Sequence, residues 1–181
     1  MSGWLRSTPQ GRGGPGESSI SEVDADTGQI IAAELTGNDV DDGSRVGPLF
    51  EQIAGPVASF TGDGAYDRDD VYREVGQRHP DAAVIVPPRS SAVPSTTAQT
   101  APSKRDRHLQ LIAERGRMGW QRASGYNWRA LVEADIGRYK RVIGDALRSR
   151  TEGRQTTEVA IAVASLNRML ELGQPEYVRL P

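Results

Sequence analysis

Two segments place an acidic residue where a carboxylate can do chemistry. In the first, Asp63 stands in the segment TGDGAYD (61–67), directly after a buried apolar run. Ligands of open α/β sheets bind outside the carboxyl ends of the strands, and flanking glycines let a phosphate or an ion approach the backbone closely. An aspartate in such a turn is also a common turn or helix cap. Asp63 alone therefore indicates either a ligand site or a local cap.

The second segment is a predicted helix over 127–149 and the residue before it. Four residues at spacings of 3, 4 and 7 share one helix face: Tyr126, Arg129, Glu133 and Lys140. The apolar stripe of this helix is centred about 80° away, so Glu133 lies at the shoulder of the buried face. Arg129 and Glu133 also have the ordinary spacing of an ion pair on a solvated helix surface. The spacing leaves both interpretations open.

The elements that must position these residues alternate along the chain. Apolar runs predict strands over 29–36, 57–61 and 82–86. Helical spacing predicts one helix that carries Val46 to Ile53 and another over 67–75. Strands that alternate with helices at short spacing indicate an α/β sheet with parallel crossovers.

The C-terminal half has a different character. Residues 89–103 are rich in Ser, Thr and Pro and are predicted to be a low-complexity insertion without regular structure. Helices are predicted over about 105–117, 127–149 and 155–172. His79 and His108 fit no metal-ligand spacing and are expected to be surface residues.

The charge distribution is asymmetric. Residues 1–103 hold 7 basic and 15 acidic residues, whereas residues 104–181 hold 15 basic and 9 acidic ones. Because only two of the 22 basic residues are lysine, the basic half suits phosphate recognition by arginine, although a GC-rich genome also enriches arginine. The chain has no cysteine, no apolar run of membrane length and no signal peptide, so a bacterial cytoplasmic protein without a membrane partner is expected.

Together the two acidic segments resemble a known family. The pattern Tyr-x2-Arg-x3-Glu-x6-Lys resembles the signature of insertion-sequence DDE transposases around their third catalytic carboxylate. GDGAYD (62–67) is similar to the segment around the second catalytic aspartate of that family. Three further stretches are similar, and the whole resemblance covers about 22–175: Ile85–Arg89, Gly116–Trp120 and Leu166–Met169.

The resemblance implies a fold and a chemistry. The fold is α/β, a partial ribonuclease-H-like catalytic domain with a central mixed sheet and a helical C-terminal half. The implied activity is DNA cleavage and strand transfer with two Mg2+ ions, which stabilise the attacking and leaving oxygens. Asp63 and Glu133 would be catalytic metal ligands. Arg129 and Lys140 would hold DNA phosphates, and Tyr126 would help to position the strand.

The N-terminus departs from the family. The first catalytic aspartate belongs to a strand upstream of the hairpin represented here by Asp24–Gly28, yet no acidic residue precedes Glu17. Codons for Gly14–Ser21 exist that, shifted by one base, read Arg-Thr-Trp-Arg-Lys-Leu-His-Leu, which is similar to the family sequence before the hairpin. Residues 1–21 are therefore expected to be disordered and out of frame, 22–175 a truncated catalytic domain, and 176–181 a tail.

Three functions follow as hypotheses. The first is a transposase segment for insertion-sequence ends and target DNA, catalytically incomplete because two carboxylates do not fix two Mg2+ ions well. The second is a non-catalytic DNA-binding relic that inhibits an intact transposase by occupying ends or pairing with its subunits. The third is a small Mg2+ phosphohydrolase that uses Asp63. A homo-oligomer is possible in the first two.

Overall fold

Three antiparallel strands form one side of a mixed β-sheet. The computed structural model describes residues 2–8, 17–24, 26–37, 40–128, 137, 141–142, 144 and 147–173. β1 (Ser2–Thr8) pairs with β2 (Glu17–Asp24), and β2 pairs with β3 (Ile30–Gly37), both antiparallel. The strand predicted over 29–36 is confirmed as β3, displaced by one residue.

Two short strands extend the sheet beyond β1. β4 (Ser59–Thr61) lies parallel to β1, and β5 (Ala83–Ile85) lies parallel to β4. The strand order is β3-β2-β1-β4-β5. The predicted α/β class with a central mixed sheet and parallel crossovers is therefore confirmed.

The N-terminal strands correct one prediction. Disorder was expected over 1–21, but residues 2–8 and 17–21 are strand residues. β1 has β2 at one edge and β4 at the other. Because strand pairing satisfies backbone N–H and C=O groups whatever the side chains are, a segment without local strand signals can still complete a sheet. The expectation failed because it used local composition alone.

A tight turn joins β2 to β3 at the predicted hairpin. The Asp24 Oδ1 atom accepts a hydrogen bond from the Asp26 N–H at 3.0 Å, and the Asp24 carbonyl accepts one from the Gly28 N–H at 2.7 Å. Gly28 has a φ of 70°, a left-handed conformation that favours glycine. The carboxylate of Asp24 therefore serves the turn.

The helices and 3-10 turns that connect the strands supply half of the central hydrophobic cluster. A 3-10 turn, η1 (Asp42–Arg45), leads into α1 (Val46–Glu51), and a second one, η2 (Gly64–Tyr66), precedes α2 (Asp69–Arg78). These helices and the central strands share one cluster of buried side chains, which includes Val46, Leu49, Phe50, Phe60, Val71, Val75 and Val84. The predicted helices of this region are confirmed, the second starting two residues later than expected.

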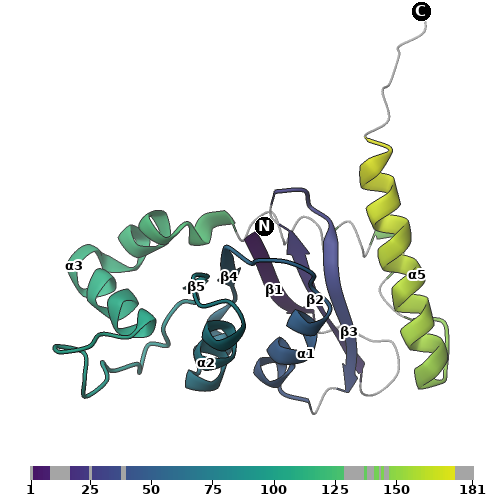
Figure 1. The fold of residues 1–181 in the computed structure, drawn as a ribbon. Coiled ribbons are helices and arrows are strands. Elements are labelled where there is room, and N and C mark those ends of the chain that lie inside the picture. The colour runs from purple at the N-terminus through teal and green to yellow at the C-terminus, as the bar shows by residue number, and fades with distance from the viewer. Residues whose placement is uncertain are drawn as a thin grey trace, which may run out of the picture.

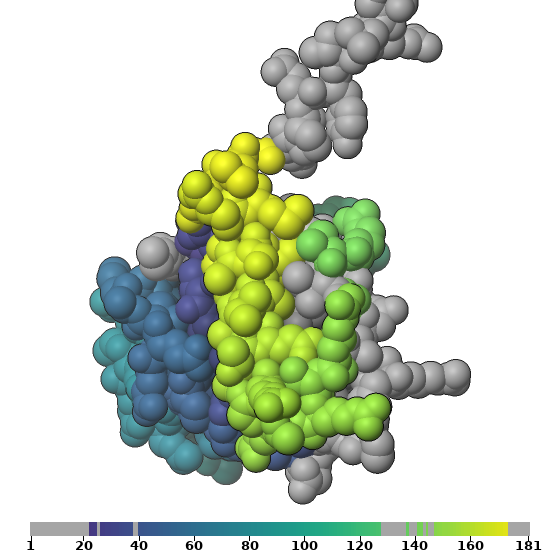
Figure 2. Space-filling view, turned by 90° about the vertical axis from the view of Figure 1, so that its right-hand side faces the viewer, coloured from purple at the N-terminus to yellow at the C-terminus, as the bar shows by residue number. Residues whose placement is uncertain are grey.

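Two longer helices cover the two edges of the sheet (Figure 1). α3 (Lys104–Ser124) lies beside β5 (Figure 1), where His108 contacts the Val84 carbonyl. α5 (Glu152–Glu171) lies along β3, and Figure 2 shows this face. The Asn167 side chain accepts a hydrogen bond from the Ile30 N–H at 2.9 Å and donates one to the Ile30 carbonyl at 2.8 Å. At Ile30 these two bonds occupy backbone groups of the edge strand β3 that could otherwise pair with another chain.

The segment 89–103 contains neither helix nor strand, as predicted. It is nevertheless anchored, because the Ser95 N–H donates to Asp106 Oδ1 at 2.7 Å and the Ser95 hydroxyl donates to Asp106 Oδ2 at 2.8 Å. Among the described residues, no helix has the length and apolar character to cross a membrane. The predicted tail over 176–181 lies outside the described residues.

Candidate functional site

Asp63 lies where the sequence predicted, just beyond the carboxyl end of β4. It is the N-cap of η2, and its Oδ1 atom accepts a hydrogen bond from the Ala65 N–H at 2.8 Å. The side chain is half-buried, and no hydrogen bond from a described residue reaches Oδ2. The capping interpretation is therefore confirmed for one oxygen, while the other oxygen is left to accept a ligand.

Gly62 is required by packing beneath this loop. A Cβ atom at Gly62 would lie 2.8 Å from Cδ2 of Tyr66. The Tyr66 ring is fully buried and packs edge-on against Phe60 at a centroid distance of 5.9 Å. The glycine thus lets the loop fold back over its own tyrosine, a structural reason that the sequence did not reveal.

Asp67 is the electrostatic anchor of the same loop. Its side chain is fully buried, and its two oxygens accept hydrogen bonds from Arg105 Nε at 2.7 Å and Arg105 Nη2 at 3.1 Å. The Arg89 N–H donates to Oδ2 at 2.9 Å. Burial raises the pKa of Asp67, but the hydrogen bonds and charges of Arg105 and Arg89 outweigh burial and leave that pKa below its usual value. Asp67 is therefore a paired carboxylate at neutral pH.

Arg89 also contacts the Asp63 loop through its side chain. Its Nε atom donates to the Gly64 carbonyl at 3.3 Å. Arg117, from the stretch 116–120, donates from Nη2 to the Pro88 carbonyl at 3.0 Å. Two stretches that the sequence singled out only by resemblance therefore meet around the Asp63 loop. Sequence reasoning missed Asp67 and Arg105, because a contact across 38 residues leaves no local pattern.

Tyr126 is held inside the protein. It follows Gly125, which ends α3 with a φ of 76°, and it begins the 3-10 turn η3 (Tyr126–Trp128). The tyrosine is 8% exposed, and its ring centroid lies 5.2 Å from that of Trp120. The Tyr126 ring therefore has little exposed surface with which it could contact a DNA strand directly.

The other signature residues lie outside the described residues. These are Arg129, Glu133 and Lys140, and most of the predicted helix over 127–149 is outside as well. The role of Glu133 as a metal ligand and the roles of Arg129 and Lys140 as phosphate contacts stay predictions. The helices predicted over 105–117 and 155–172 are confirmed as α3 and α5, although α3 runs on to Ser124.

The described residues alone do not form a metal centre. Within them, no group of three His, Asp or Glu side chains is arranged to hold an ion. Asp63 contributes one carboxylate with one oxygen committed to a cap, which does not fit the two Mg2+ ions that the resemblance implies.

A basic surface accompanies the loop. The exposed charged residues of α3 are mainly cationic and include Arg107, Arg115, Arg117 and Arg122, with Glu114 as an acidic exception. Arginines on an exposed helix suit a polyanion, because they neutralise phosphates without reading bases. This agrees with the positive charge predicted for the C-terminal half.

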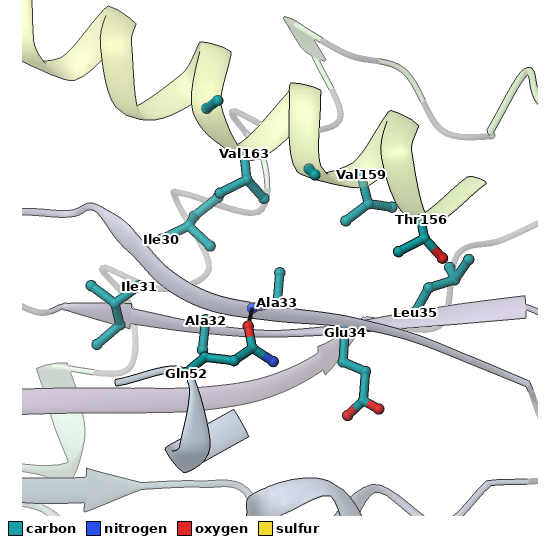
Figure 3. Close-up of a pocket in the computed structure, with 12 residues that line it drawn as sticks. Ile30, Ile31, Ala32, Ala33, Glu34, Leu35, Gln52, Thr156, Val159 and Val163 are labelled. Carbon is teal, nitrogen blue, oxygen red and sulfur yellow. Dashed lines mark hydrogen bonds between the residues drawn. The ribbon is translucent and has the colours of Figure 1, made fainter. Parts of the chain in front are cut away.

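A groove of about 600 Å³ between β3 and α5 is not the chemical site. Figure 3 shows Ile30, Val159 and Val163 lining it, and Gln52 accepting the hydrogen bond of the Ala33 N–H at 3.2 Å. Its acidic side chain, Glu34, is already paired, since Arg45 Nε donates to it at 3.1 Å. The groove lacks a cluster of reactive groups and belongs to the packing of α5.

The family assignment follows from the whole sequence. The model of the transposase DDE domain matches residues 8–168. The chain belongs to the transposase DDE family. The match contains both acidic segments and begins earlier than the resemblance over 22–175. No solved structure matches the chain. Dependence on a divalent cation and action on DNA are general properties of this family.

Proposed function

We propose that this chain is a DNA-binding segment of a DDE transposase that does not cleave DNA by itself. The family match over residues 8–168 supports the transposase class. The observation that carries the proposal is β1, the strand upstream of the Asp24–Gly28 hairpin, which contains no acidic residue. That strand is where the family resemblance locates the first catalytic aspartate.

The remaining site residues keep their proposed roles. Asp63 and Glu133 are two of the three metal ligands of an intact enzyme, and Arg129 and Lys140 contact DNA phosphates. The free Oδ2 atom of Asp63 beyond the carboxyl end of β4 supports this assignment. Tyr126 acts from a packed position, so we assign it to the placement of the signature helix. The mixed sheet, flanked by helices, supports a ribonuclease-H-like fold.

Binding without cleavage gives the chain a biological use. Such a chain occupies insertion-sequence ends or pairs with an intact transposase subunit, and in both cases it inhibits transposition. The exposed arginines of α3 support salt-sensitive affinity for DNA. We propose that the chain acts in the bacterial cytoplasm.

The origin of the missing aspartate is a separate proposal. We infer that residues 1–21 are read out of frame, because codons allow a one-base shift that yields the family-like sequence before the hairpin. Backbone pairing of β1 and β2 is compatible with such an origin, since it needs no particular side chains. Reading the gene upstream of codon 22 tests this. A shifted frame with an aspartate-bearing strand is expected, and codons that forbid the shift would overturn it.

The functional proposal is tested by comparing binding with cleavage. A labelled duplex that carries an insertion-sequence end is incubated with the full chain, with and without Mg2+. We expect a retarded complex in both conditions and no cleaved strand. Asp63→Ala and Glu133→Ala should leave binding unchanged within about twofold, because neither residue contributes a cation to the phosphates. Mg2+-dependent cleavage that both substitutions abolish would contradict the proposed incompleteness.

A further inference from the structure

His108 joins α3 to the sheet through both of its ring nitrogens. The Nε2 atom lies 2.6 Å from the carbonyl oxygen of Val84 on β5. The Trp120 Nε1–H donates to Nδ1 at 2.9 Å. Since a carbonyl only accepts and an indole N–H only donates, the imidazole is neutral with its proton on Nε2. The prediction that His108 is a surface residue holds only in part, because the side chain is half-buried and both ring nitrogens have partners.

A break in α3 makes this contact possible. His108 and Trp120 are twelve residues apart, which would separate them by about 18 Å along a continuous helix. Gly116 has a φ of 69° and a ψ of 170°, so the helix stops there and restarts in a new direction, as Figure 1 shows. Nothing lies within 4 Å of a Cβ placed on Gly116. The glycine is therefore needed for its backbone conformation and not for space.

Trp120 carries the contact onward to the signature. It is 1% exposed, and its ring packs against His108 at a centroid distance of 5.6 Å and against Tyr126 at 5.2 Å. Tyr126 is the first residue of the signature, three residues before Arg129. A series of contacts therefore runs from the central sheet through His108 and Trp120 to the start of the predicted signature helix.

We propose that His108 and Trp120 are positioning residues, which fix Tyr126, the first residue of the signature, relative to the sheet that bears Asp63. Neither side chain contacts substrate in this account. The His108–Trp120 hydrogen bond sets the orientation of the indole ring, and the indole ring sets the place of Tyr126. The consequence for DNA rests on the proposed function, whereas the positioning itself does not.

Two amide variants separate the two bonds of His108. His108→Asn puts an amide oxygen near the place of Nδ1 and keeps an acceptor for Trp120. His108→Gln puts an amide nitrogen near the place of Nε2 and keeps a donor for Val84. His79→Asn is the matched control, because His79 packs edge-on against Phe50 at 5.1 Å and takes no part in this series of contacts.

The first readout needs no DNA. The indole N–H resonance of Trp120 is identified by its loss in Trp120→Phe, and the backbone amide of Tyr126 is followed in the same spectra. We expect both signals to keep their positions in His108→Asn and to move in His108→Gln. Equal shifts in the two variants would overturn the proposal. A Tyr126 signal that stays unchanged in Trp120→Phe would overturn it as well.

Acidification provides an independent readout. Protonation puts a second donor on Nδ1, which then faces the indole N–H and breaks the bond. Burial lowers the pKa of His108, against smaller raising effects of the bond to Val84 and the charge of Asp67. The other charged groups that line this region are Asp81, Lys104 and Arg107. The Trp120 and Tyr126 signals should therefore shift together at a pH below the usual histidine range, and His108→Asn should lack this step.

DNA binding connects the positioning role of His108 and Trp120 to the proposed function, and it is measured with a duplex that carries an insertion-sequence end. His108→Gln and Trp120→Phe should weaken binding about 3- to 10-fold, as expected for one lost hydrogen bond, with an unchanged salt dependence because no phosphate contact is removed. His108→Asn should stay within about twofold of the unmodified chain. An unmodified chain that fails to bind DNA would overturn the proposed function, while the spectra still decide the positioning role. Equal DNA affinities of all three variants would overturn the proposed effect of Tyr126 placement on DNA binding.

Discussion

Glu22 on β2 and Asp67 after η2 are both buried carboxylates, but their surroundings are opposite. Asp67 accepts two hydrogen bonds from Arg105 and one from the Arg89 N–H. Glu22 is 0% exposed, and neither of its oxygens has a hydrogen-bond partner among the described residues. Burial raises the pKa of Glu22 to about 8, whereas the partners of Asp67 leave its pKa below the usual value.

The difference separates two regions of the molecule. The buried carboxylates of Asp67, at the Asp63 loop, and of Asp106, at the start of α3, both have hydrogen-bond partners, whereas the buried hydroxyls of Thr61 and Tyr72 have none among the described residues. In the N-terminal hairpin, the backbone pairs correctly while a core side chain is chemically unsuited to its place. Backbone pairing can thus place a carboxylate in the core without a polar partner, whereas Asp67 is buried together with the guanidinium group that pairs with it.

The largest effect is expected at Asp67. Asp67→Asn leaves Arg105 without its counter-charge and should destabilise the chain by about 3–5 kcal/mol in urea unfolding. Because the pKa of Asp67 is lowered in the folded state, its contribution is present above the unfolded pKa and is lost as the pH falls through the folded one. Asp69→Asn, exposed and two residues away, is the control and should cost less than about 1 kcal/mol. A loss of unfolding free energy in Asp67→Asn as small as that in Asp69→Asn would contradict the contrast drawn between Asp67 and Glu22.

Asp106 gives a second paired carboxylate to test. It accepts hydrogen bonds from Ser95 and Ser103, including the Ser103 N–H at 2.9 Å, and these bonds lower its pKa. Asp106→Ala should cost about 1.5–3 kcal/mol, because it removes the charged acceptor of the hydrogen bonds that Ser95 and Ser103 donate. Limited proteolysis should then cut within 89–103. Unchanged proteolysis would show that Asp106 does not anchor that segment.

Glu22 should respond in the opposite direction. Glu22→Met replaces an unpartnered carboxyl by an apolar side chain of similar size and should stabilise the chain by about 1–3 kcal/mol. The folded pKa near 8 lies above the unfolded value of 4.5, so the unmodified chain should lose stability as the pH rises between these values. The Met variant should lack that slope, and Glu22→Gln should remove the slope with a smaller gain. Destabilisation by both variants would show that Glu22 has a partner.

The smallest effect is expected at a surface ion pair. Arg168 Nη1 lies 2.8 Å from Glu171 Oε2 at the end of α5, and both side chains are exposed. Glu171→Gln should change stability by no more than about 0.5 kcal/mol, which sets the baseline for the buried positions. An effect comparable to that of Asp67→Asn would mean that charge alone, not burial, controls these energies.

The sequence predicted what local patterns encode. The spacing of Val46, Leu49 and Phe50 and the run that ends at Thr61 identified a helix and a strand that the structure confirms. Contacts between distant residues were missed, because pairing of β1 with β4 or of Asp67 with Arg105 has no local signal. The predicted end of the helix near residue 117 falls at the break at Gly116, but the helical segment that continues from there to Ser124 was missed.

The central claim is that this transposase DDE chain binds DNA but does not cut it. One gel tests it directly: a labelled insertion-sequence end is titrated with the full chain in Mg2+, and bound and cleaved DNA are quantified at two salt concentrations. The account predicts a complex that weakens steeply with salt and no cleaved strand. Cleavage that depends on Mg2+ and Asp63, or a chain that binds no DNA at low salt, would contradict it.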